Sequence, residues 1–177
     1  AEKKGGKVNY RTVSDKEKKP YEINIVYLDA FEDVRGFLSS QAIALALKGV
    51  PGIYFNSLIG ARNWTEGVEK LGYNRAINRK KFDGDELEKE IDDSSSLKSK
   101  VYGIYKRMLK ARVDEPLFSP VADQVISDLG NNIFALVRFD KNTSIFCIFN
   151  LSSESVVVSE NIVKETLKKD GARDLIT

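Results

Sequence analysis

The chain has 177 residues, and 42% of them are hydrophobic, which is enough apolar material to form a folded core. Its 28 Lys and Arg residues nearly balance its 26 Asp and Glu residues, so the formal charge of +2 does not indicate a nucleic-acid partner. The absence of histidine excludes Ser-His-Asp, Cys-His and histidine–metal chemistry among these residues. Cys147 is the single cysteine, so no internal disulfide can form, which indicates either a reducing compartment or a fold that needs no disulfide.

No apolar run approaches the roughly 20 residues that a membrane span needs. Residues 1–19 are polar and lysine-rich, unlike the apolar centre of a secretory signal. We therefore expect a soluble, cytoplasmic chain with no membrane partner. The basic residues between Lys3 and Lys19 are interspersed with acidic ones, and this argues against the alternative of nucleic-acid binding.

Residues 1–19 hold few apolar side chains and predict a loop or an arm. From Tyr21 to Tyr27 apolar residues alternate incompletely with polar ones, which predicts a short extended segment. Residues 35–48 contain no helix breaker after Gly36 and are apolar on all sides, so they predict a buried helix.

Gly49 is expected to end that helix, and Pro51 and Gly52 to form a turn before a short strand at residues 53–55 that is buried on both faces. A buried helix followed by a buried strand is typical of parallel α/β folds. Residues 56–93 are polar and predict a long loop with one short helix at 85–91. Long insertions after a strand commonly carry function.

Ser96 predicts the cap of an amphipathic helix that runs to about Arg112. Beyond it the pattern predicts strands at 124–129, 133–140, 144–151 and 156–158, separated by turns. These strands predict a small antiparallel sheet or sandwich, with a domain boundary near residues 116–120. Cys147 lies in an alternating strand and is expected to be a small core residue.

Two motifs at a characteristic spacing make the chain recognisable. The run Pro51-Gly52-Ile53-Tyr54-Phe55 is followed by Asn74-Arg75-Ala76-Ile77-Asn78-Arg79. Together they resemble the last barrel segments of the α-amylase superfamily, in its sucrose phosphorylase-like branch, which includes glucosylglycerate phosphorylases. The resemblance extends upstream through residues 9–11 and 21–24 and covers nearly the whole chain.

This resemblance implies an α/β fold: the last segments of a (β/α)8 TIM barrel followed by a small C-terminal antiparallel β domain. Residues 1–19 would form an acceptor-side loop or arm. Residues 20–115 would form the end of the catalytic barrel, with its last helices, its eighth strand and the long loop after it. Residues 116–177 would form the all-β domain.

The family performs retaining chemistry with two carboxylates ~5 Å apart, one as the nucleophile and one as the general acid/base. In the family these residues, and a third acid that steadies the sugar, lie on strands before the segment seen here. The resemblance therefore implies a C-terminal portion that contains no catalytic residue and is inactive alone, with no cofactor and no metal. Its partners would be the N-terminal remainder of the barrel, an α-glucoside and phosphate. The alternative is a non-catalytic truncated domain with weak sugar binding or no independent function.

The same resemblance supplies candidate substrate-binding residues. Arg75 aligns with a family arginine that hydrogen-bonds the bound glucose, and its planar guanidinium suits that role. Asn78 and Arg79 are expected to brace the loop. Tyr10 and Arg11 lie where the family has its acceptor-side loop, and for them plain loop structure is an equal alternative. Trp64 is expected either to stack on a sugar ring or to anchor the loop.

Overall fold

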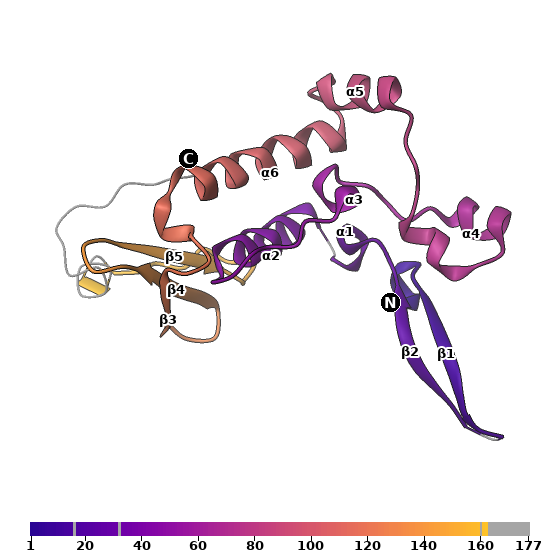
Figure 1. The fold of residues 1–177 in the computed structure, drawn as a ribbon, viewed down its shortest axis with the longest axis horizontal. Coiled ribbons are helices and arrows are strands. Elements are labelled where there is room, and N and C mark those ends of the chain that lie inside the picture. Colours follow the sequence, from indigo (N-terminus) through magenta and orange to yellow (C-terminus); the bar gives the residue numbers. More distant parts are fainter. Residues whose placement is uncertain (16, 32, 160, 163–177) are drawn as a thin grey trace. The chain divides into compact units, whose positions relative to one another are not determined.

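The computed structural model describes residues 1–15, 17–31, 33–159 and 161–162 (Figure 1). The chain divides into two compact units, each built from two stretches of sequence. The first unit comprises Ala1–Leu38 and Ile53–Tyr105, and the second comprises Ser39–Gly52 and Lys106–Thr177. The predicted domain boundary near residues 116–120 stays a prediction.

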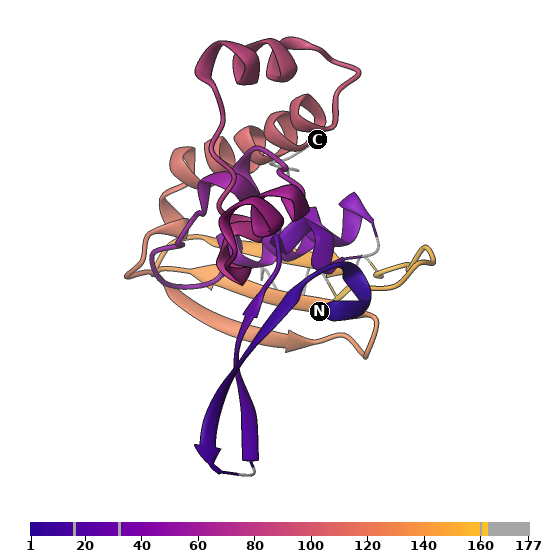
Figure 2. The same cartoon turned by 90° about the vertical axis from the view of Figure 1, so that its right-hand side faces the viewer.

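A β-hairpin opens the first unit. After a short 3-10 helix, η1 (Glu2–Lys4), strand β1 (Lys7–Ser14) pairs antiparallel with β2 (Glu17–Asn24). Figure 2 shows the hairpin as a long twisted ribbon. Residues 7–14 and 17–19, which lie within the predicted loop or arm, are therefore strand, and the extended segment predicted from residue 21 is confirmed as far as Asn24. Few apolar residues mark the hairpin because both of its faces are largely exposed, so backbone pairing rather than a buried face defines it.

Short helices follow in the rest of the first unit. They are α1 (Tyr27–Ala30), α3 (Phe55–Leu58), α4 (Thr65–Leu71), η2 (Asn74–Asn78) and α5 (Gly84–Asp92). The helix predicted at 85–91 is confirmed as α5, whose first turn is capped by the Asp83 carboxylate accepting from the Glu86 amide at 3.1 Å. The region predicted as a loop before it also contains α3, α4 and η2, each too short to show a hydrophobic period.

The core of the first unit contains aliphatic and aromatic side chains. The rings of Tyr27, Phe31 and Phe37 meet edge to face with centroids 5.2–6.3 Å apart. Gly60 has a φ of +64°, and a Cβ added there would lie 2.8 Å from the Val101 side chain, so this close approach requires glycine. The fully buried members of this core include Leu28, Phe37, Ile59, Ile77, Val101 and Tyr105.

Two longer helices each contribute residues to both units. Helix α2 (Val34–Ala46) confirms the helix predicted at 35–48. It is not buried on all sides, however, because Arg35 and Ala44 are exposed while Phe37, Leu38 and Leu45 are buried. Helix α6 (Leu97–Asp114) confirms the second predicted helix, and the Ser96 hydroxyl accepts from the Ser99 amide at 2.9 Å as the predicted cap.

The strand predicted at residues 53–55 is wrong. Ile53 and Tyr54 have no regular structure, Phe55 begins α3, and all three side chains are exposed. A strand needs a neighbour for its backbone groups, and none of the described strands pairs with these residues. The described residues therefore contain the predicted helix but not the strand that was predicted to follow it.

The second unit contains a three-stranded antiparallel sheet in the order β3-β4-β5. Its strands β3 (Asp123–Asp128), β4 (Ile133–Phe139) and β5 (Ser144–Asn150) confirm three of the four predicted strands. The central strand β4 is the most buried, from Ala135 to Arg138. The fourth strand, predicted at 156–158, is wrong, because side-chain and backbone bonds among residues 150–154 form a turn after β5 and Val157 is almost fully exposed.

Two arginines hold the C-terminal end of α2 within the second unit. Arg138 is fully buried and donates to the carbonyl oxygens of Ala46 at 3.0 Å and Ser119 at 2.6 Å. Arg112 donates to the carbonyl oxygens of Leu45 and Gly49. Burial lowers the pKa of both guanidinium groups, although not enough to remove their charge at neutral pH. The last carbonyls of a helix have no partner within it, and here the two arginines supply one.

Candidate substrate-binding site

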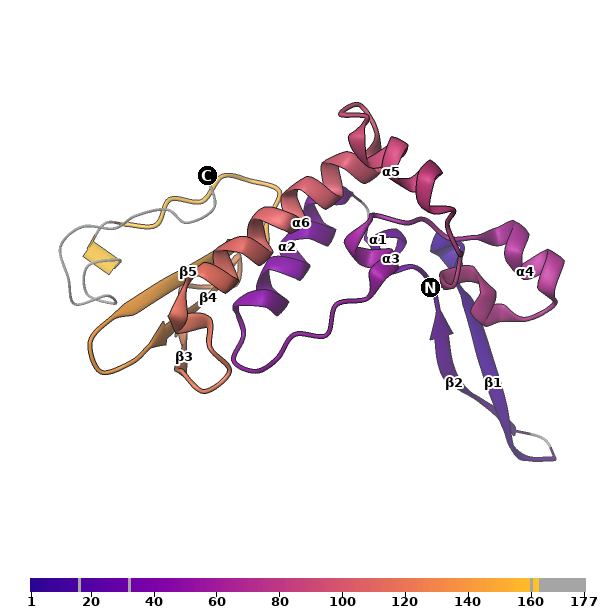
Figure 3. The same cartoon turned by 45° about the horizontal axis from the view of Figure 1, so that its top comes forward.

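Arg75 lies on η2, which contacts both strands of the hairpin and α4. Figures 1 and 3 show α4 beside the base of the hairpin. The Nε–H of Arg75 donates to both carboxylate oxygens of Glu22 on β2, at 2.8 and 3.0 Å. The ion pair is partly open to solvent, with 46% of the Arg75 side chain and 26% of the Glu22 side chain exposed. The residue expected to touch substrate is therefore held by a carboxylate 53 positions away in the sequence.

Two asparagines extend this ion pair into a network. Asn9 on β1 donates from Nδ2 to Glu22 at 2.7 Å, and its Oδ1 accepts from Asn74 at 2.6 Å. The four side chains come from β1, β2 and the start of η2. We call this set of Asn9, Glu22, Asn74 and Arg75 the Arg75 network. Through these side chains it connects the hairpin to η2 and the loop around it, which we call the Arg75 loop.

The charges within the Arg75 network support one another. Hydrogen bonds from Arg75 and then from Asn9 lower the pKa of Glu22 below its ordinary value. The hydrogen bond and the charge of Glu22 raise the pKa of Arg75. Both groups are therefore ionised across the neutral range.

The contact with Glu22 leaves most of the Arg75 donors available. A guanidinium carries five N–H groups, and Glu22 engages only the one on Nε. The side chain of Tyr21 also forms a hydrogen bond with Arg75 and adds to the rise of its pKa. The N–H groups that Glu22 and Tyr21 leave can bind a ligand rich in oxygen acceptors.

Asn78 ends η2, and its backbone oxygen is hydrogen-bonded whereas its side-chain oxygen is not, within the part of the chain that the structure describes. Its backbone oxygen accepts from the Tyr54 hydroxyl at 2.7 Å and from the Asn56 amide at 3.1 Å. Its side-chain Oδ1 is buried without a hydrogen-bond partner among the described residues. Buried polar atoms are nearly always paired, so this oxygen points to water, a ligand or a further stretch of protein at this place.

The other three predicted residues are exposed. Arg79 follows η2, and Tyr10 and Arg11 lie on β1, next to Asn9 but outside the Arg75 network. Sequence reasoning did not identify Glu22 and Asn74 as site residues, because their roles depend on pairing across more than 50 positions. The only sequence feature that could have indicated this role is Glu22 itself, a carboxylate in the predicted extended segment that could form an ion pair with an arginine elsewhere in the chain.

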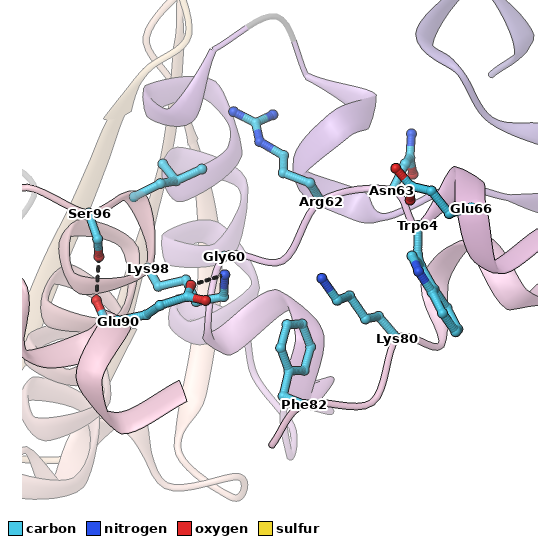
Figure 4. A pocket seen from close by; sticks show the side chains of 11 residues that line it. Gly60, Arg62, Asn63, Trp64, Glu66, Lys80, Phe82, Glu90, Ser96 and Lys98 are labelled. Carbon is cyan, nitrogen blue, oxygen red and sulfur yellow. Dashed lines mark hydrogen bonds and ion pairs between the residues drawn. The ribbon is translucent and has the colours of Figure 1, made fainter. Parts of the chain in front are cut away.

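A separate pocket of about 290 Å³ lies in the first unit, and none of the five predicted residues lines it (Figure 4). The Nζ atoms of Lys80 and Lys98 each lie 5.4 Å from the centre of the Phe82 ring, and Lys98 also pairs with Glu90. The lining residues are Gly60, Arg62, Asn63, Trp64, Glu66, Lys80, Phe82, Glu90, Ser96, Leu97 and Lys98.

Trp64 lines this pocket and also packs inward. A Cβ added at Gly67 would lie 2.1 Å from its indole ring, so the ring rests on that glycine. The Trp64 backbone N–H donates to the Ile77 carbonyl at 2.8 Å. Of the two roles expected for Trp64, these contacts support the anchoring of the loop.

Within the described ranges no group of three or more His, Cys, Asp or Glu side chains is arranged to hold a metal ion. Of the helices in those ranges, none combines the length and the apolar character needed to cross a bilayer.

Comparison with known proteins identifies relatives over most of the chain. No protein-family profile matches it. Over 159 residues it is 40% identical to glucosylglycerate phosphorylase from Spirochaeta thermophila, covering 84% of this chain and 27% of the relative. Over 184 residues it is 35% identical to glucosylglycerate phosphorylase from Escherichia coli, covering 99% of this chain and 32% of the relative. The chain thus spans about a third or less of the length of these relatives.

The fold also has a counterpart among solved structures. Sucrose 6F-phosphate phosphorylase from Thermoanaerobacter thermosaccharolyticum matches 84% of this chain and 29% of its own, with a TM-score of 0.70 and 20% sequence identity. A sucrose phosphorylase from Agrobacterium vitis is 26% identical over 157 residues. The chain is therefore homologous, over most of its length, to the glucosylglycerate and sucrose phosphorylases, the branch of the α-amylase superfamily that its motifs resemble.

Proposed function

We propose that this chain forms the C-terminal part of a retaining glycoside phosphorylase that transfers glucose from a disaccharide or glucosylglycerate to phosphate. The observation that carries this proposal is the identity of 33–40% to three glucosylglycerate phosphorylases over 84–99% of the chain. In this proposal residues 20–115 supply the last helices and the long substrate loop of a (β/α)8 barrel, and residues 116–177 form its terminal β domain.

Arg75 is the central substrate-binding residue of the proposal. Terminal N–H groups of its guanidinium would donate to hydroxyls of the transferred glucose, a role that needs several donors at fixed angles. Asn78 would brace the loop through its backbone contacts with Tyr54 and Asn56. Tyr10 and Arg11 on the exposed hairpin would face the acceptor, and Arg79 would support the loop.

The chemistry would proceed in two displacements. A carboxylate attacks C1 of the glucosyl unit while a second carboxylic acid protonates the departing oxygen, which leaves with the acceptor. An oxygen of phosphate then attacks C1 and releases the enzyme carboxylate, which gives glucose 1-phosphate. In this proposal both carboxylates come from barrel strands outside this chain, which by itself binds but does not turn over substrate. Consumption of cellular phosphate and formation of a charged sugar phosphate favour a cytoplasmic site of action.

The test is release of glucose 1-phosphate from glucosylglycerate and from sucrose in the presence of phosphate. We expect no release by the chain alone and release when it is joined to the N-terminal part of the barrel. Arg75→Ala should lower kcat/KM of the joined protein by about a hundredfold, whereas Lys81→Ala, at an exposed position of the same loop, should have little effect. Turnover by the chain alone would contradict the placement of the carboxylates. Sugar binding without turnover in the joined protein would favour the non-catalytic alternative.

A further inference from the structure

We propose that Glu22 is a positioning residue for Arg75, and that through Asn9 and Asn74 it makes the β-hairpin and the Arg75 loop act as one substrate-binding element. This inference rests on the proposed function for its kinetic consequences, but its structural content stands on the contacts within the Arg75 network.

The first step is the geometry of the ion pair. Glu22 engages Nε–H rather than the terminal nitrogens, with distances to its two oxygens of 2.8 and 3.0 Å. A guanidinium group is planar, so a carboxylate held at Nε restricts the direction in which the two terminal NH2 groups point. Glu22 thus orients Arg75 without occupying the donors that a ligand would use.

The second step is the support of Glu22 itself. Asn9 donates to Glu22 at 2.7 Å from the neighbouring strand, and the same Asn9 accepts from Asn74 at 2.6 Å. Asn74 directly precedes Arg75 on η2. The network therefore connects the loop to the hairpin at two points, once through the Arg75 side chain and once through its neighbour. A movement of the hairpin would move the guanidinium with it.

Glu22 affects the orientation of Arg75 more than it affects the free energy of unfolding. The ion pair is partly exposed, and exposed pairs contribute little to the free energy of unfolding. An arginine left without its carboxylate keeps its charge but samples several rotamers, and the resulting loss of orientation lowers the rate of an oriented reaction far more than the stability of the fold. Removal of Glu22 should therefore affect substrate use much more than melting temperature.

The experiment uses the joined protein described above with the variants Glu22→Ala, Glu22→Gln and Arg75→Ala and the double variant Glu22→Ala/Arg75→Ala. Glu17→Gln is the matched control, since Glu17 lies on the same strand and pairs with Lys19 at 3.1 Å without touching Arg75. Kinetics with glucosylglycerate and sucrose, melting temperature, and the Nε–H signal of Arg75 in spectra of arginine-labelled protein are measured.

We expect Glu22→Ala to lower kcat/KM by about tenfold or more, with little change in melting temperature and with rapid solvent exchange of the Arg75 Nε–H. Glu22→Gln keeps an acceptor oxygen and should restore most of the activity. In the Arg75→Ala background the Glu22→Ala change should have little further effect, because the residue that it positions is gone.

Wild-type kinetics in Glu22→Ala, or independent losses that multiply in the double variant, would overturn the proposal. If the joined protein turns over no glucoside, the proposed function fails, and the Nε–H signal then decides the positioning role. If the Nε–H signal is protected in the unsubstituted protein and stays protected in Glu22→Ala, the positioning role is overturned. If the signal is protected in the unsubstituted protein and in Glu17→Gln but lost in Glu22→Ala, the positioning role is supported.

Discussion

The sheet of the second unit and the hairpin of the first unit differ in how many strands pair and in how far their side chains are buried. The sheet pairs three strands in a continuous register and buries its central strand, including the guanidinium of Arg138. The hairpin has only two strands and leaves Tyr10, Tyr21 and Ile23 about half exposed or more. Two-stranded hairpins are marginal by themselves, so the hairpin depends on its contacts with the rest of the first unit, while the sheet depends on its own core.

The largest effect is expected from Arg138→Ala in the second unit. The substitution leaves the carbonyl oxygens of Ala46, which is buried, and of Ser119, which is partly buried, without this donor, and we expect a loss of about 3 kcal/mol or more in the free energy of unfolding. Urea unfolding measures this loss. Arg107→Ala, at an exposed position of α6, is the control and should change the stability by less than about 0.5 kcal/mol. Equal effects of the two substitutions would show that the sheet does not depend on this buried donor.

An intermediate effect is expected from Gly67→Ala in the first unit. The added Cβ would lie 2.1 Å from the indole of Trp64, so the ring must move, at a cost of about 1–3 kcal/mol. Trp64 is the only tryptophan, so its fluorescence emission should shift to the red as the ring moves into water.

Gly103→Ala is the matched control for this prediction. It adds a Cβ on α6 where no atom lies within 4 Å, and it should stabilise the helix by up to about 1 kcal/mol. An unchanged emission spectrum in Gly67→Ala would mean that Trp64 does not anchor the loop.

Cys147 on β5 is partly buried, and the reactivity of its thiol reports on its surroundings in the sheet. Burial raises the pKa of its thiol to about 11, while the charge of Arg138 has a smaller opposing effect. Since the thiolate is the reactive form, we expect modification at pH 8 to be about a hundredfold slower in the native protein than in denaturant. Comparable rates in the two conditions would indicate that β5 opens readily.

The smallest effect concerns the acid titration of Glu22. Its pKa is lowered in the folded protein, so the ion pair stabilises the fold above the ordinary pKa of a glutamate, and this contribution is lost as the pH falls through the lowered value. The carboxyl carbon signal of Glu22 should therefore titrate below the ordinary range, and Arg75→Ala should return it towards that range. A titration unaffected by Arg75→Ala would mean that the pair does not form in solution.

The sequence predicted most accurately the elements whose signal is local. The amphipathic helix after Ser96, the short helix after Asp83 and the strands β3, β4 and β5 follow from caps, periodicity and turns, and the structure contains all of them. The strand at residues 53–55 was predicted from an apolar run, but a strand also requires a neighbour, which no local pattern supplies. The hairpin strand β1 was missed because its faces are exposed and carry no clear alternation of apolar side chains.

The sequence by itself determined the homology, the helices and strands with strong periodicity, and Arg75 as the candidate residue, because motif spacing, caps and hydrophobic periods are properties of neighbouring positions. Only the tertiary structure decided which groups meet Arg75 and which carbonyls Arg138 and Arg112 satisfy. The contacts of Arg75 with Glu22, of Arg138 with Ala46 and of Arg112 with Gly49 join positions more than 50 residues apart, and a charged side chain carries no mark in the sequence of the partner that the fold brings to it.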